Sequence, residues 1–155
     1  MHQIKGFVYA KIKMTDDTKD SRIIAEVQPR RGSKPQCSGC GKRSAGYDRM
    51  PAPRLFEFIA IFNIPVFLQY TMRRVDCPDC GVTVEQVPWA PGKHTCCDVF
   101  RHFLATWAKR MSWKETAECF HVKWDTVRRS VQWVVAYGLK NRSLEGIEAL
   151  GVDEV

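Results

Sequence analysis

Two short segments of the chain, residues 37–41 and 77–81, share the pattern Cys-x-x-Cys-Gly. Together they supply four thiolates, which is the ligand set of a tetrahedral structural zinc site. The two-residue gap in each pair lets both sulfurs reach one ion, and the glycine that follows suits a backbone that reverses with positive φ. We therefore expect one structural zinc ion. The four expected ligands are Cys37, Cys40, Cys77 and Cys80.

The 36 residues between the two pairs must fold out and back for the four sulfurs to meet. Residues 55–62 and 66–76 are apolar and rich in β-forming side chains, and residues 63–65 between them are typical of a hairpin turn. The apolar residues of the second run alternate, which predicts a half-buried strand with one buried face. The sequence thus predicts a zinc ribbon with an elongated hairpin. Two further strands, residues 7–14 and 22–27, are expected to extend the same sheet.

Other roles for the cysteines are less consistent with the sequence. Disulfides are disfavoured because the count of seven is odd and the first residues do not have the pattern of a secretory signal, so we expect a reducing cytoplasm. Neither Cys-x-x-Cys is followed by the helical periodicity of a thioredoxin-like redox motif. Cys96, Cys97 and Cys119 lie outside the pattern. We interpret them as unpaired small hydrophobes, with a second metal site that includes His94 as the alternative.

The charge of the chain is unevenly distributed along its 155 residues. Residues 93–142 carry 10 basic and 4 acidic side chains, whereas residues 143–155 carry no basic and 4 acidic ones. A basic segment of this kind is a candidate for binding nucleic acid, and a solvated basic surface is the alternative. No apolar stretch is long enough to span a bilayer, so we expect no membrane partner.

Helical periodicity begins after residue 91. Residues 95–98 have the form of a capping box, and they predict a first helix with a buried face. The residues expected on that face are Val99, Phe103, Trp107 and Met111. A second capping box, residues 112–115, starts a short helix that extends to Cys119. A third helix is expected over residues 124–137, with Gly138 as its stop.

A short helix, a tight turn and a longer helix form the pattern of a helix-turn-helix, in which the second of these helices enters the major groove of DNA. Arginine can bind guanine and glutamine can bind adenine there, while lysine neutralises phosphate. His121 occupies the turn, where positive φ favours glycine. A plain three-helix bundle with a solvated outer face is the alternative. The residues expected to bind DNA are Lys114, Lys123, Trp124, Asp125, Arg128, Arg129 and Gln132.

The order of these motifs resembles bacterial insertion-sequence transposases of the ISL three family. In that family a zinc ribbon and a helix-turn-helix precede a ribonuclease-H-like catalytic domain with an Asp-Asp-Glu triad. The resemblance implies that Asp153 matches the first aspartate of the triad. Family enzymes cut and join DNA with carboxylates that hold two divalent ions, so Mg²⁺ is expected only for a complete catalytic domain. The motifs that carry the resemblance lie at residues 37–40, 72–81, 87–90, 115–117, 124–127 and 149–155.

The predicted fold class is α+β, with a β-rich zinc ribbon over residues 1–92 and an all-α helix-turn-helix domain over residues 93–142. Residues 143–155 are expected to start the catalytic domain. We expect a DNA-binding portion of a transposase that recognises the terminal inverted repeats of an insertion sequence, at the nucleoid in the bacterial cytoplasm, with no catalysis by this chain alone. Self-association is left open. Two alternatives are the front of an active transposase divided by truncation or frameshift, and a zinc-stapled protein-interaction module.

Overall fold

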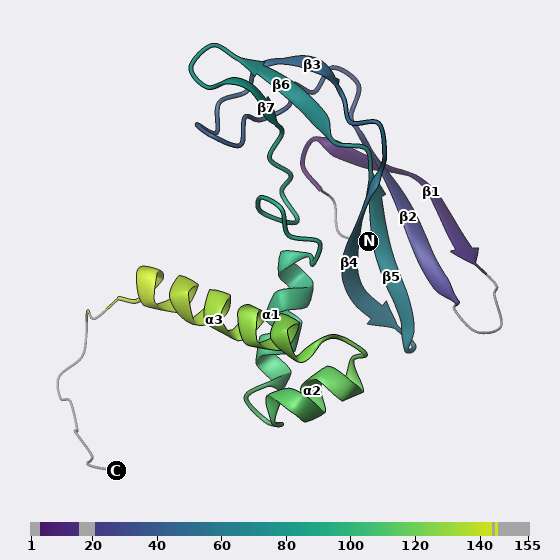
Figure 1. Ribbon diagram of the computed structural model, residues 1–155, viewed down its shortest axis with the longest axis vertical. Helices are drawn as coiled ribbons and strands as arrows, with labels where there is room; N and C mark the ends of the chain where they lie inside the picture. Colours follow the sequence, from purple (N-terminus) through teal and green to yellow (C-terminus); the bar gives the residue numbers. More distant parts are fainter. Residues whose placement is uncertain (1–3, 16–20, 144, 146–155) are drawn as a thin grey trace. The chain divides into compact units, whose positions relative to one another are not determined.

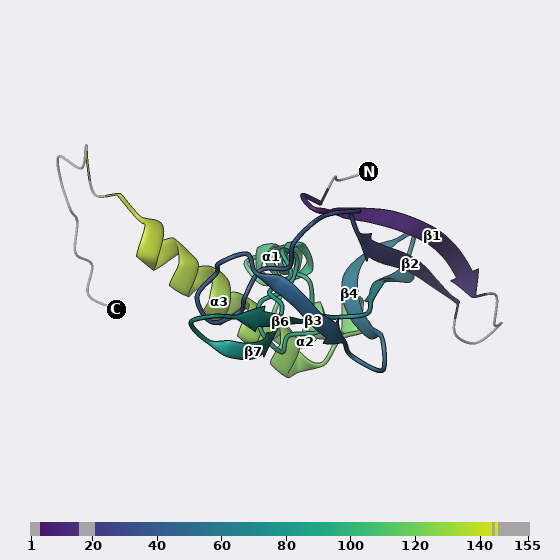
Figure 2. The ribbon, with the colours of Figure 1, turned by 90° about the horizontal axis from the view of Figure 1, so that it is seen from above.

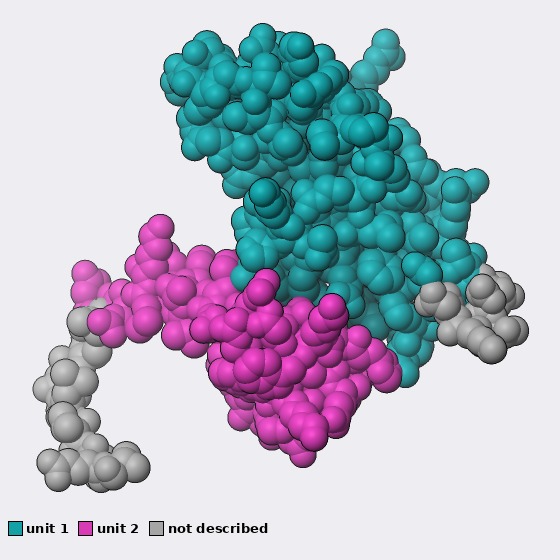
Figure 3. Space-filling model, viewed as in Figure 1, with its two compact units in different colours: residues 1–103 teal, residues 104–155 magenta. Residues whose placement is uncertain are grey.

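The computed structural model describes residues 4–15, 21–143 and 145. In this part of the chain seven strands precede three helices, which confirms a mixed α+β fold with a strand-rich N-terminal part. The chain divides into two compact units, residues 1–103 and 104–155 (Figure 3). The strands all belong to the first unit, and the second contains α2 and α3.

Four strands form the larger sheet of the first unit, in the order β1-β2-β5-β4 (Figure 1). The bounds are Phe7–Thr15 for β1, Arg22–Pro29 for β2, Arg54–Ile61 for β4 and Ile64–Tyr70 for β5. The two expected N-terminal strands are thus confirmed. β2 runs parallel to β5, with Ala25 opposite Leu68, so β1 and β2 join the sheet beside the hairpin. They extend the sheet of the hairpin, as expected, but the cysteines lie outside this four-stranded sheet, at the smaller sheet and in the chain before it.

The hairpin of β4 and β5 turns at Phe62 and Asn63, one to two residues earlier than expected. Both residues have positive φ, 48° and 64°, and Ile61 pairs with Ile64. Two central residues with positive φ form the tight turn whose twist matches that of the flanking strands. Pro65 therefore lies within β5. Its missing N–H is tolerated there because the pairing with β2 starts only at Val66.

The smaller sheet of the first unit has the order β3-β6-β7 and carries one of the two cysteine pairs at its β6–β7 turn. Its strands are Ala45–Arg49 (β3), Arg73–Cys77 (β6) and Gly81–Val84 (β7). The single strand expected over residues 66–76 is therefore divided into β5 and β6. The predicted alternation of buried residues persists across the division, because Tyr70 and Met72 are both buried. What changes is the partner: β6 pairs with β3 and β7 instead of with β4. Figure 2 shows the two sheets from above.

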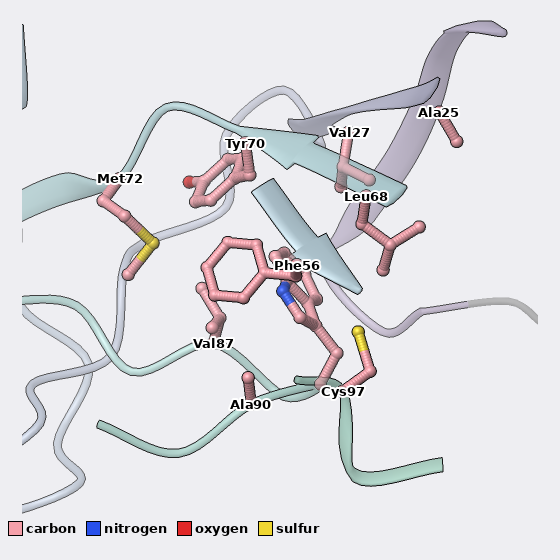
Figure 4. Close-up of a cluster of buried hydrophobic side chains, with 10 residues drawn as sticks. Ala25, Val27, Phe56, Leu68, Tyr70, Met72, Val87, Ala90 and Cys97 are labelled. Carbon is pink, nitrogen blue, oxygen red and sulfur yellow. The ribbon is translucent and has the colours of Figure 1, made fainter. Parts of the chain in front are cut away.

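The core of the first unit is a cluster of buried apolar side chains, most of which are labelled in Figure 4. Trp89 is a member of this cluster. The indole ring makes edge-to-face contacts with the rings of Phe7, Phe56 and Tyr70, at centroid distances of 4.8, 5.7 and 5.4 Å. Such contacts add to the free energy gained by burial. The other buried members of the cluster are Ala25, Val27, Leu68, Met72, Val87, Ala90 and Cys97.

α1 (Asp98–Trp107) starts later than the expected capping box. The backbone of Thr95 accepts a hydrogen bond from Glu57 N at 2.7 Å, and Cys97 N donates to Glu57 O at 2.9 Å, so this segment pairs with β4 and does not cap a helix. The predicted buried face is also wrong, because Val99 is 42% exposed and Trp107 is 38% exposed. The fully or almost fully buried side chains of α1 are Phe100, Arg101, Leu104 and Ala105.

In the second unit, α2 (Trp113–Cys119) and α3 (Trp124–Asn141) are close to their expected positions. The predicted capping box at α2 is confirmed: Ser112 Oγ accepts from Glu115 N, and Glu115 Oε2 accepts from Ser112 N at 2.9 Å. Gly138 is not a helix stop, since α3 continues past it to Asn141. None of the helices in the described ranges combines the length and the apolar character needed to cross a membrane.

Candidate functional site

The four predicted metal-binding cysteines lie together in the first unit. The Sγ atoms of Cys37, Cys40, Cys77 and Cys80 are all within 4.8 Å of one another. A tetrahedral ion with metal–sulfur bonds of about 2.3 Å holds its sulfurs about 3.8 Å apart. The donor type and the spacing therefore fit a structural metal site, with Cys37 and Cys77 buried and the other two exposed.

Each pair is shaped by the glycine that follows it. Gly41 and Gly81 have φ values of +74° and +71°, a region that glycine enters without steric cost. Gly41 N donates to Cys37 O at 3.0 Å, which closes the first turn, and Gly81 pairs with Cys77 at the β6–β7 turn. Gly39 is favoured for a different reason, because a Cβ there would lie 3.0 Å from Cys80 Sγ, closer than an ordinary van der Waals contact.

Hydrogen bonds favour the thiolate form of Cys37. Its sulfur lies 3.3 Å from the hydroxyl oxygen of Thr83, and Gly39 N donates to it at 3.4 Å. These hydrogen bonds lower the pKa of Cys37 to about 6. The bond from Thr83 contributes most, followed by those from backbone N–H groups. Thr83 lies 46 residues from Cys37 in the sequence, so no local motif indicates this contact. A hydroxyl that supports a metal-bound sulfur is typical of second-layer contacts at metal sites.

A second contact connects the two cysteine pairs at the surface. Lys42 Nζ lies 2.7 Å from Asp79 Oδ2, and both side chains are exposed.

The remaining cysteines do not join the cluster. Cys97 is buried in the apolar core, Cys119 is exposed on α2, and burial raises the pKa of Cys96 to about 12. These positions fit the interpretation of Cys96 and Cys97 as small apolar side chains.

The turn between α2 and α3 has a defined geometry in the second unit. His121 has a φ of +53°, the strained value expected at this turn. Val122 N donates to Ala117 O at 3.0 Å, and Thr116 and Ala117 are buried. A short capped helix, a tight turn with a left-handed residue and a longer helix therefore follow one another as the sequence predicted.

The polar face of α3 is a connected network and not a row of independent side chains. Asp125 Oδ1 accepts from Arg128 Nε at 3.0 Å and from Arg128 Nη2 at 2.6 Å, while Arg129 Nε lies 2.6 Å from Asp125 Oδ2. Arg128 Nη1 also donates to Gln132 Oε1 at 3.0 Å. The Arg128 guanidinium lowers the pKa of the Asp125 carboxyl, so the carboxylate stays ionised and holds both arginines.

The other predicted DNA contacts flank this network. Lys114 is exposed on α2, and Lys123 is the residue that precedes α3. Trp124 is 49% exposed, with its ring 5.9 Å from that of Trp113.

Asp153 lies outside the described residues, so its predicted catalytic role stays a prediction.

Two curated proteins are similar to this chain. Both carry the description "transposase for insertion sequence element IS1557", and they come from Mycobacterium tuberculosis strains CDC 1551 and H37Rv. Each is 32% identical to the chain over 142 residues, which is 90% of the chain and 32% of the relative. The chain thus spans about a third of the length of these relatives. No protein-family model matches the chain, and no solved structure matches it.

Proposed function

We propose that this chain is the DNA-binding part of an insertion-sequence transposase of the ISL three family. In this proposal, α2 and α3 form a helix-turn-helix that recognises the terminal inverted repeats of the element. The similarity to the two transposases for IS1557 supports a transposase-related function. This role brings the chain to DNA at the bacterial nucleoid, in a reducing cytoplasm where thiolates remain available to a metal.

The observation that carries the proposal is the polar face at the start of α3. Recognition helices contact bases with the residues of their N-terminal half, and this half of α3 presents two arginines and a glutamine at one face. Asp125 holds the two arginines and Arg128 holds Gln132, so less conformational entropy is lost when these side chains bind.

The chemistry of these groups suits base edges in the major groove. An arginine can donate two hydrogen bonds to guanine O6 and N7, and a glutamine can pair with adenine. Arg129 is the more accessible of the two arginines, with 63% of its side chain exposed against 33% for Arg128. Arg128 reaches a guanine when it exchanges its bond to Gln132 for one to the base. Lys114 and Lys123 then lie where phosphate contacts are expected.

The four cysteines of the first unit are proposed to bind one zinc ion with a structural role. Zinc is the usual metal of closed sites with four thiolates, and such sites stabilise folds instead of performing chemistry. Magnesium binding is proposed only for a complete catalytic domain, to which Asp153 would contribute the first carboxylate.

Binding to the DNA of the element's own ends tests the proposal. The zinc-loaded chain is titrated into a labelled duplex that carries the terminal inverted repeat and into a scrambled duplex of the same composition, at several salt concentrations. We expect tighter binding to the repeat and a steep decrease of both affinities with salt, because counterions are released from the phosphates. Equal affinity for the two duplexes contradicts recognition by α3. A salt-insensitive complex with a protein and no DNA binding supports the protein-interaction module instead.

A further inference from the structure

A hollow of about 170 Å³ lies in the first unit, beside the smaller sheet. A water molecule takes up about 30 Å³ of liquid, so the hollow has room for a tetrahedral phosphate group and several waters. Its wall contains polar and cationic side chains from segments that are far apart in the sequence. They include Lys5, Ser33, Lys34, Gln36, Arg43 and Gln86.

The charge in the wall of the hollow is strongly positive. Lys5, Lys34 and Arg43 form no ion pair with any described residue, and all three are exposed. Glu85 also lines the hollow, but the Arg73 guanidinium neutralises it through bonds of 2.9 and 2.7 Å to Glu85 Oε2. Four cations and one carboxylate leave three uncompensated positive charges. An anion in this hollow gains attraction from each of them.

Ser33, in the wall of the hollow, carries a hydroxyl that bonds to no described protein group. Ser33 Oγ is buried and has no hydrogen-bond partner among the described residues. The backbone of the same residue is fully used, because Ser33 N donates to Arg30 O at 2.9 Å and Ser33 O accepts from Arg73 Nη1 at 2.9 Å. A buried hydroxyl costs free energy unless it forms a hydrogen bond, so this group is available as a donor to a water or an anion after a small rearrangement.

Two residues that flank the first cysteine pair, Gln36 and Arg43, belong to the wall of the hollow. Gln36 and Arg43 lie on either side of the turn that carries Cys37 and Cys40, and they pair with each other as an antiparallel bridge. Gln86 N donates to Gln36 O at 2.8 Å, which fixes this wall to the chain that leaves β7. A metal bound by the cysteines therefore holds two donors of the hollow in position.

We propose that this hollow binds one phosphate of a DNA backbone, as a contact made by the first unit that is independent of base sequence. The inference rests on the proposed function and adds a second DNA-binding surface to it. Lys5, Lys34 and Arg43 supply charge, and Ser33, Gln36 and Gln86 supply hydrogen-bond donors. Such contacts position a protein on a duplex without reading its sequence.

Two substitutions in the wall test the proposal, with a matched substitution outside it. Lys34→Ala and Arg43→Ala are compared with Lys11→Ala, which removes the same charge from an exposed position of β1 that does not line the hollow. We expect each wall variant to bind the repeat and the scrambled duplex roughly three- to tenfold more weakly, with an unchanged ratio between them. The slope of log affinity against log salt should decrease by about 0.9 for the phosphate that is lost. Lys11→Ala should behave like the parent.

Folding and zinc content are measured for each variant, and Lys5→Ala provides a third wall variant from another segment. Wall variants that keep the parental affinity and salt slope overturn the proposal, while a parent that still prefers the repeat leaves the proposed function intact. Inorganic phosphate is titrated separately against the parent by NMR. Phosphate binding in the hollow without any effect of the wall variants on DNA also overturns the proposal, because it identifies a site for free anions. A parent that does not bind DNA contradicts both.

Discussion

Arg73 and Glu85 form a buried ion pair between β6 and the chain that leaves β7. The guanidinium donates from Nε and Nη2 to Glu85 Oε2 at 2.9 and 2.7 Å, and Arg73 N donates to Oε1 at 2.7 Å. Tyr70, at the end of β5 in the other sheet, donates its hydroxyl to the same Oε1 at 2.5 Å. One carboxylate thus connects the two sheets of the first unit. No sequence motif indicates this connection.

Glu85→Gln should destabilise the first unit strongly. The substitution leaves the Arg73 guanidinium, only 12% exposed, without a counter-charge, and breaking a buried pair in this way costs about 3–5 kcal/mol. Urea unfolding of the zinc-loaded chain measures the change. Asp79→Asn is the control, since its exposed pair with Lys42 should contribute less than about 1 kcal/mol. Equal effects of the two substitutions would show that the Glu85 pair does not stabilise the first unit.

The hydroxyl of Tyr70 should make stability depend on pH in alkaline solution. Burial, followed by the hydrogen bond to Glu85, raises the pKa of Tyr70 above its usual value of about 10. The folded state therefore favours the protonated phenol, so this contribution is complete below the unfolded pKa and is lost as the pH rises toward the folded one. Tyr70→Phe should be less stable than the parent at pH ~8, and the difference should shrink above pH ~10. Unfolding curves at both pH values measure it, and a constant difference contradicts the assignment.

Gly138→Ala should stabilise the end of α3. Gly138 lies inside the helix with nothing within 4 Å of an added Cβ, and alanine is favoured over glycine in a helix by about 0.8–1 kcal/mol. Amide hydrogen exchange of the last turns of α3 should slow several-fold. Gly32→Ala is the control, because it also has open space but a φ of +78°, and it should destabilise. Faster exchange in Gly138→Ala would instead indicate a helix stop at this residue.

One zinc ion per chain is expected after purification without added metal. Cys77→Ser should lose the ion together with the folded first unit, since structural zinc binding is coupled to folding. Cys119→Ser removes an exposed thiol outside the cluster and should keep the ion. Elemental analysis and far-ultraviolet circular dichroism measure both effects. Full zinc content in Cys77→Ser contradicts the four-cysteine site.

Features with a short sequence signature were predicted well. The cysteine pairs and their glycines each lie within five residues, and the capping box of Ser112 and Glu115 spans four, so local chemistry defines them. The alternation through Tyr70 and Met72 identified a buried face correctly. It could not show that the strand changes partners between them, because hydrogen-bond pairing depends on distant segments.

The errors have physical reasons of the same kind. In α1, two apolar stripes run side by side at helical spacing, and the structure buries Phe100 and Leu104 where the sequence favoured Val99 and Phe103. A β-turn at Phe62 places a bulky residue in a conformation that its type disfavours, so turn propensity pointed to the proline instead. Thr83 and Glu85 were missed because their partners lie in other segments of the chain, 46 residues away for Thr83 and 15 for the bond from Tyr70 to Glu85.

The most direct test of DNA recognition by α3 is the base preference of an Arg128 variant. Parent, Arg128→Ala and Lys140→Ala are compared for binding to the inverted-repeat duplex and to the scrambled duplex, each loaded with zinc. Lys140 is a cation in the last turn of α3, far along the helix from the proposed contact. Arg128→Ala should lose about 1–3 kcal/mol on the repeat and most of the preference for it, while Lys140→Ala keeps the preference. An unchanged preference in Arg128→Ala would contradict sequence recognition by this face of α3.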